Sequence, residues 1–69
     1  MQPDELVRMA NQIARFFEPY PADEAVDGVI EHLKKFWTPA MRAQLIQHVH
    51  ATTDGLQPLV VQAAARLET

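Results

Sequence analysis

Cysteine is absent from the sequence, and glycine and basic residues are scarce. Without cysteine the chain can form no disulfide and no thiolate metal site. Its two glycines, Gly28 and Gly55, lie too far apart to build a phosphate-binding loop. Six Lys and Arg against nine Asp and Glu give a net charge of −3, which argues against a nucleic-acid partner, because such binding depends on clustered cations.

Long apolar stretches are also missing. No uninterrupted run approaches the ~20 residues that cross a bilayer. The acidic start, MQPDELV, lacks the basic region and the apolar block of a signal peptide. We therefore expect a cytoplasmic protein that does not interact with membranes.

The 69 residues form a single predicted domain, residues 1–69. Hydrophobic residues make up 48% of the chain, which is enough for a packed core. A domain of this size nevertheless buries only about 60% of the surface that its unfolded chain exposes. Small domains are usually reinforced by disulfides, a metal or a partner. Because disulfides are excluded, a partner becomes an attractive source of stability.

Apolar residues recur at helical spacing, which predicts an all-α fold, a small bundle of three to four short helices. The expected helices span about residues 3–17, 22–37, 39–51 and 57–67. Their limits follow from the EPYPA and TTDG breaks and from prolines at first helical positions. Gly28 lies inside the second helix at a cost of ~1 kcal/mol, and close approach of a neighbour would explain it. The last helix is apolar over a wide arc, so it is either the central helix or a surface for another protein.

The stretch KKFWTPAMRAQL, at the corner between the second and third helices, contains the only tryptophan. Phe36 and Met41 are expected to fill the core. Trp37 suits either the core or an interface, because tryptophan is common among binding hot spots. Arg42 falls inside the apolar arc of its helix. Either its stem lies on apolar surface with the guanidinium in water, or the guanidinium pairs with a carboxylate.

A search for reactive groups yields no catalytic, cofactor-binding or metal-binding residue. His48 and His50 point about 200° apart on a helix, so they cannot share a metal, and His32 belongs to another helix. No side chain is placed as a nucleophile, and no acidic stretch has the spacing of a calcium-binding loop. The sequence therefore predicts a protein that is not an enzyme, and a minor enzyme or metal carrier that uses the histidines stays an open alternative.

Three segments, LVRMANQIARFF, EAVDGVIEHLKKFWTPAMRAQL and GLQPLV, resemble the delta subunit of NAD-dependent, molybdenum-containing formate dehydrogenases. The resemblance covers nearly the whole chain in the same order. It implies a non-catalytic accessory subunit of a complex that oxidises formate to carbon dioxide and reduces NAD. The molybdenum cofactor, iron–sulfur clusters, FMN and NAD would all belong to the large subunits, and none to this chain.

The resemblance also implies partners, namely the catalytic and electron-transfer subunits, whose assembly, stability or cofactor insertion the chain would support. Our hypothesis is that Trp37 and Arg42 form an amphipathic anchor for these subunits. Arg8 and Asn11, on the polar face of the first helix, are weaker candidates for the same surface. The alternative is a free-standing helical interaction module or a homodimer that associates through the last helix.

Overall fold

Four helices make up the computed structural model, which describes residues 2–68, and no strand occurs in that range. They are α1 (Pro3–Phe17), α2 (Ala22–Phe36), α3 (Pro39–Ala51) and α4 (Pro58–Leu67). The all-α fold class is confirmed. Only two bounds differ from the expected ones, because Trp37 and Gln57 have extended backbone conformations and flank α2 and α4 rather than belonging to them.

Local sequence signals account for where the helices begin. Proline occupies the first turn of α1, α3 and α4. The N–H groups of a first turn have no acceptor within the helix, so proline, which lacks an N–H, breaks no hydrogen bond there. Thr38 caps α3, since its Oγ1 accepts a hydrogen bond from the Met41 N–H at 3.2 Å. Acidic residues lie in the first turn of α1 and α2, and basic residues in their last turn, as the helix dipole favours.

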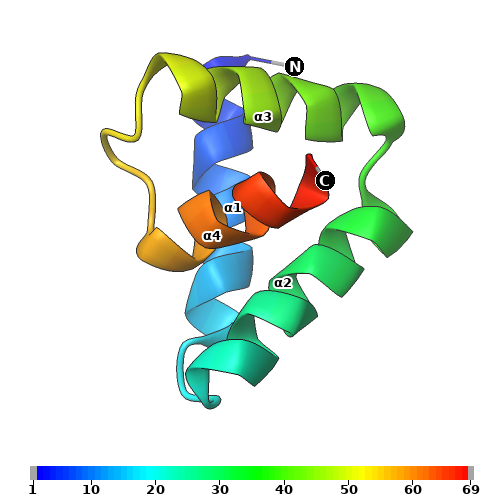
Figure 1. Ribbon diagram of the computed structural model, residues 1–69. Helices are drawn as coiled ribbons and strands as arrows, with labels where there is room; N and C mark the ends of the chain where they lie inside the picture. Colours follow the sequence, from blue (N-terminus) through cyan, green and yellow to red (C-terminus); the bar gives the residue numbers. More distant parts are fainter. Residues whose placement is uncertain (1, 69) are drawn as a thin grey trace.

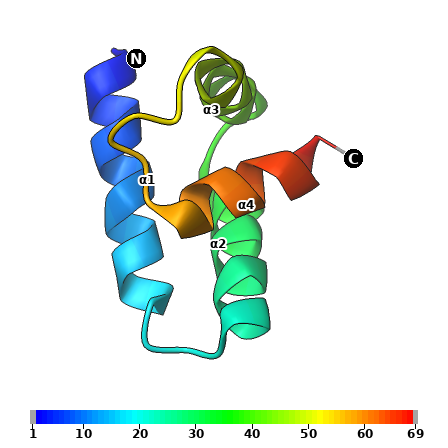
Figure 2. The same cartoon turned by 60° about the vertical axis from the view of Figure 1, so that its left-hand side comes forward.

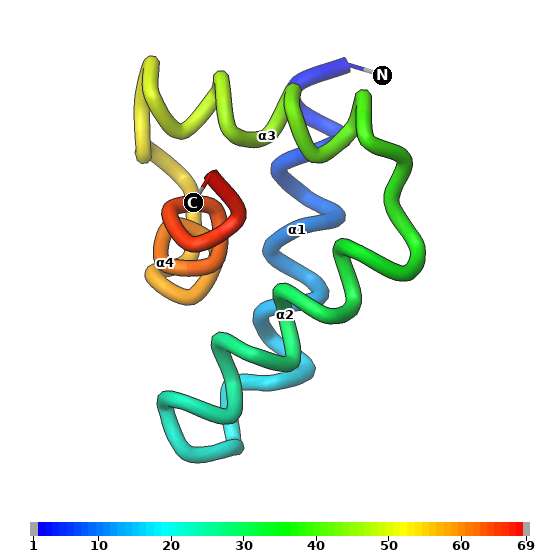
Figure 3. Tube along the Cα trace, turned by 45° about the vertical axis from the view of Figure 1, so that its right-hand side comes forward, coloured from blue at the N-terminus to red at the C-terminus, as the bar shows by residue number. Residues whose placement is uncertain are grey.

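Each of the four helices contacts the other three. Figure 2 shows α1 and α2 side by side and running in opposite directions, joined by a short turn. Helix α3 crosses the end of the molecule where α1 begins and α2 ends, as Figures 1 and 3 show. Helix α4 contacts all three other helices and packs most extensively against α2. Val60, Ala63 and Ala64 of α4 are almost fully buried, so a large part of its wide apolar arc belongs to the core. The sequence left open a central helix or a surface for another protein, and this burial favours the first.

The core lies where α4 meets the other helices and is rich in small side chains. Alanines from α1, α2 and α4 are almost fully buried and let the helix backbones approach one another closely. Larger apolar side chains fill the remaining space. The fully buried ones are Leu6, Val29, Leu33, Leu45 and Val60.

Gly28 has a structural explanation. A Cβ atom at this position would lie 2.5 Å from the ring of Phe17, at the end of α1, which is too close for any real contact. The ring therefore packs directly on the α2 backbone. This is the close approach that the glycine inside a helix suggested.

Two further features concern the connections and the helix lengths. Gly55, in the loop before α4, has a φ of 78°, a conformation that glycine adopts without strain. Within residues 2–68 no helix has both the length and the apolar character that a bilayer span requires.

Candidate functional site

Reactive groups do not gather anywhere in the described part of the chain. No set of three His, Asp or Glu side chains lies close enough to hold a metal ion within residues 2–68. The histidines have separate surroundings. The His32 ring stacks on Phe36 with centroids 4.7 Å apart, and His50 Nε2 lies 2.6 Å from Glu68 Oε1. The remaining candidates for a functional site are surfaces that could contact another protein.

Arg42 caps the C-terminal end of α2. Its Nη1 donates hydrogen bonds to the carbonyl oxygens of Trp37 (2.6 Å), Leu33 (3.1 Å) and Lys34 (3.3 Å). The last carbonyls of a helix have no partner within the helix and favour a positive charge, so the half-buried guanidinium satisfies both needs. No carboxylate of residues 2–68 forms an ion pair with Arg42. The sequence suggested water or a carboxylate as its partner, and neither suggestion included these carbonyls.

Phe36 and Trp37 differ in exposure from the arrangement in which Phe36 fills the core and Trp37 belongs to an anchor for a partner. Trp37 is only 5% exposed and belongs to the core, whereas Phe36 is 69% exposed. The expectation that Phe36 fills the core was wrong, because Phe36 lies one turn after His32, on the edge of α2. Trp37 leaves the helix in an extended conformation. Trp37 can offer a partner little surface, and its role in partner binding stays a prediction.

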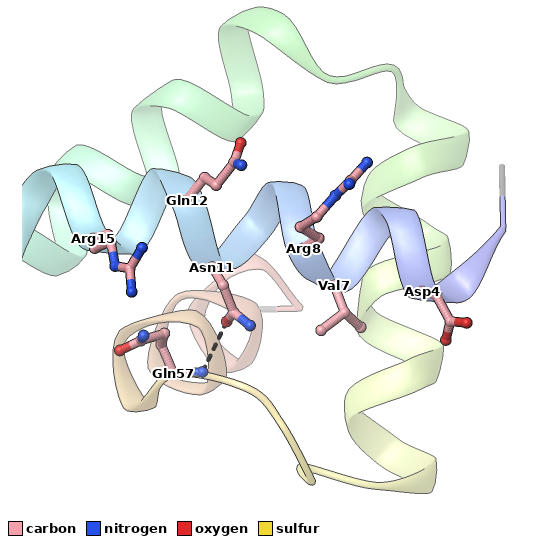
Figure 4. Close-up of a pocket in the computed structure, with 7 residues that line it drawn as sticks. All are labelled: Asp4, Val7, Arg8, Asn11, Gln12, Arg15 and Gln57. Carbon is pink, nitrogen blue, oxygen red and sulfur yellow. Dashed lines mark hydrogen bonds between the residues drawn. The ribbon is translucent and has the colours of Figure 1, made fainter.

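Asn11 holds the loop before α4 against α1. Its Nδ2 donates to the Gly55 carbonyl at 2.7 Å, and its Oδ1 accepts from the Gln57 N–H at 2.9 Å (Figure 4). Both partners are backbone groups more than forty residues away in the sequence. Asn11 therefore fixes the tertiary structure, and its contribution to partner binding stays a prediction.

Arg8 and Arg15 lie on the outer side of α1 and project away from its ribbon in Figure 4. Both are exposed, and neither forms a hydrogen bond or ion pair with any of residues 2–68. They line a shallow hollow of about 360 Å³, which we call the arginine hollow. Its lining residues are Asp4, Val7, Arg8, Asn11, Gln12, Arg15 and Gln57.

A second hollow opens between α1 and the C-terminal end of α2 and has a volume of about 520 Å³. We call it the aromatic groove. It is lined by Met9, Gln12, Ile13, Phe16, His32, Phe36, Trp37 and Met41. Phe16 is 68% exposed, almost as much as Phe36. Exposed apolar side chains that gather in one hollow are better candidates for an interaction site than scattered ones.

The aromatic groove was not predicted as a site. On the helical wheel Phe16 and Met9 fall in the apolar arc of α1, a position that does not distinguish a buried side chain from an exposed one. In the structure the buried residues of α1 are Leu6, Ala10 and Ala14, so the buried face is displaced to one side of that arc and Phe16 is left at the opposite margin. The signal available in the sequence was the width of the arc, which exceeds what four short helices can cover.

The fold and the site together define a class of protein, a small all-α domain whose candidate site is an interaction surface rather than a group of reactive side chains. The family model of the NADH-dependent formate dehydrogenase delta subunit FdsD matches residues 5–64. The chain belongs to this family, in agreement with the resemblance found in its sequence segments. No curated protein and no solved structure matches the chain.

Proposed function

We propose that the chain is a non-catalytic accessory subunit that supports the assembly, stability or cofactor insertion of the larger subunits of a cytoplasmic NADH-dependent formate dehydrogenase. The observation that carries this proposal is the family match over residues 5–64, since the family is named as a subunit of that enzyme. The partners would be the catalytic and electron-transfer subunits.

The residues of the chain agree with an accessory role. A molybdenum cofactor, iron–sulfur clusters, FMN and NAD are expected in the complex, and we propose that none of them binds to this chain. It has no cysteine to ligate a cluster. Gly28 lies beneath the Phe17 ring and Gly55 lies in a turn, so neither belongs to a glycine-rich loop that could hold a dinucleotide. We therefore assign these groups to the partner subunits.

A partner would also compensate for the small core. Any protein that binds only the folded form stabilises it by mass action, and a chain of 69 residues has little stability to spare. The exposed aromatic groove gives such a partner an apolar surface to cover. Burial of two phenylalanine side chains would stabilise the complex and the fold together.

Deletion of the gene from its native cells tests the accessory role. We expect less assembled formate dehydrogenase, or less molybdenum and iron per catalytic subunit, and restoration of both by the wild-type gene. The fraction that does assemble should keep its KM for formate. Unchanged amount, metal content and activity in the deletion strain would overturn the accessory role, and formate oxidation by the isolated chain would overturn the non-catalytic assignment.

Affinity purification of the tagged chain from the same cells tests the partners. Recovery of the large subunits in near-equal amounts would identify a permanent subunit, and recovery only during assembly would identify an assembly factor. Recovery of the chain alone, as a dimer in sedimentation, would contradict the proposal and favour a free-standing module. The burial of Val60, Ala63 and Ala64 leaves α4 with less apolar surface for self-association through that helix.

A further inference from the structure

The aromatic groove and the arginine hollow are two parts of one surface, because Gln12 of α1 lines both. The groove supplies apolar area on the side of α1 that faces α2. The hollow supplies polar groups on the outer side of the same helix. A rod-shaped partner that lies along α1 can therefore contact both parts at once.

The lining of the groove is suited to side chains from another helix. Phe16 and Phe36 offer rigid aromatic area, and each is about two-thirds exposed. Met9 and Met41 are half-buried and flexible, so they can adjust their shape to an incoming side chain. Grooves of this composition typically receive the apolar face of an amphipathic helix.

The charge on this surface is opposite to that of the whole chain. The charged residues that line the two hollows are Arg8, Arg15 and Asp4, and two arginines against one aspartate give a charge of +1. The chain as a whole carries −3. The exposed Glu5 lines neither hollow. Because neither arginine is engaged within residues 2–68, both can pair with carboxylates of a partner.

This charge also argues against a second copy as the occupant. A two-fold dimer would place the same surface of each copy against the other. Two such surfaces, each with two arginines and one aspartate, would then be buried together, and their like net charge opposes association. A partner with carboxylates beside its apolar face has the complementary charge.

We propose that the aromatic groove and the arginine hollow form the docking surface for an acidic amphipathic helix of a partner subunit. The apolar side chains of that helix enter the groove between Phe16 and Phe36, and its carboxylates face Arg8 and Arg15. This inference rests on the proposed function, because it takes the partner to be a formate dehydrogenase subunit.

The test compares tagged variants of the full chain by the amount of formate dehydrogenase subunits that they retain. The variant Phe16→Ser/Phe36→Ser should retain at least ~10-fold less than the wild type, because aromatic side chains at the centre of an interface dominate binding. Tyr20→Ser is the matched control. Tyr20 is 50% exposed but lines neither hollow, so its loss should leave retention unchanged.

The charge is tested separately. Arg8→Gln/Arg15→Gln should reduce retention by about three-fold at low salt and abolish most of its salt dependence, because exposed charges mainly accelerate association. Lys34→Gln is the control, since Lys34 is exposed and lines neither hollow. Circular dichroism and thermal unfolding of each purified variant establish that the fold is intact.

The outcomes separate the two proposals. If the wild-type chain retains no formate dehydrogenase subunit, the proposed function fails. If the wild type retains them and the folded Phe16→Ser/Phe36→Ser variant does so equally well, the docking surface is wrong while the function stands. Retention could also fall in the phenylalanine variant but stay the same in the arginine variant and at every salt concentration. That result would overturn the acidic character of the partner helix.

Discussion

Two regions of this small protein are built from similar side chains but differ in what covers them. Beneath α4, apolar residues of α1 and α2 are buried. Asn11 forms hydrogen bonds with the backbone of Gly55 and Gln57, in the loop before α4. In the aromatic groove, apolar residues of the same two helices are exposed, and the arginines beside them have no partner within residues 2–68. The first region is complete within the chain. The second stays exposed within residues 2–68, and we propose that another protein covers it.

The corner between α2 and α3, which contains Phe36, Trp37 and Arg42, shows the same distinction for single residues. Arg42 and Trp37, the residues that most suggested an interface, are used inside the fold. Phe36, which was expected in the core, is presented to solvent together with Phe16. A residue type that is common at interfaces therefore does not identify an interface until its exposure and its partners are known.

The largest expected effect is on the free energy of unfolding, which should distinguish a residue of the buried region from a residue of the aromatic groove. Leu33→Ala should lower the free energy of unfolding by about 2–5 kcal/mol, because Leu33 is fully buried and its truncation leaves a cavity. Phe36→Ala, three residues later, should lower it by less than about 1 kcal/mol, since most of this side chain is already in water. Urea unfolding of both variants checks the difference. Equal losses would mean that Phe36 belongs to the core.

The next effect concerns Arg42. Arg42→Ala should lower the free energy of unfolding by about 1.5–3 kcal/mol, because three carbonyl oxygens at the end of α2 lose a charged donor. Arg42→Lys should restore only part of this loss, since an ammonium group lacks the reach and planar shape of the guanidinium. Chemical unfolding measures both values. A folded Arg42→Ala variant of wild-type stability that no longer binds the large subunits would instead assign Arg42 to the interface.

Asn11 should have a smaller and more local effect. Asn11→Ala should lower the free energy of unfolding by about 1–2 kcal/mol, because two backbone hydrogen bonds are lost. The Gln57 amide should exchange with solvent faster, as its N–H would lose its acceptor. Hydrogen exchange read by NMR distinguishes the local opening from a general loss of stability. Unchanged protection at Gln57 would contradict the role of Asn11 in holding the loop.

The smallest effect concerns Gly28. Alanine inside a helix normally gains ~1 kcal/mol over glycine, but Gly28→Ala should gain nothing, because the new Cβ displaces the Phe17 ring. In a Phe17→Ala background the same substitution should recover its gain. Unfolding of the two single variants and the double variant forms the required cycle. An additive result would mean that the contact between Phe17 and Gly28 has no energetic weight.

Helix positions were predictable because their signals are local. Pro3, Thr38 and Pro39 act within one turn of a helix end, and the repeat of apolar residues marks each buried face. The partners of Arg42 and Asn11 were not predictable in this way. The first depends on the angle between α2 and α3, and the second joins segments far apart in the sequence. The exposure of Phe16 likewise depends on how much of the apolar arc the other helices cover, which a helical wheel does not contain.

A photo-reactive phenylalanine analogue at position 36, in the tagged full chain purified from native cells, tests the central claim most directly. We predict that it cross-links to a formate dehydrogenase subunit, within a segment that carries apolar residues at helical spacing beside carboxylates. The same analogue in place of Lys34, on the opposite side of α2, should give no such product. A cross-link from position 34 but not from 36, or a cross-link from 36 to another copy of the chain, would contradict the account.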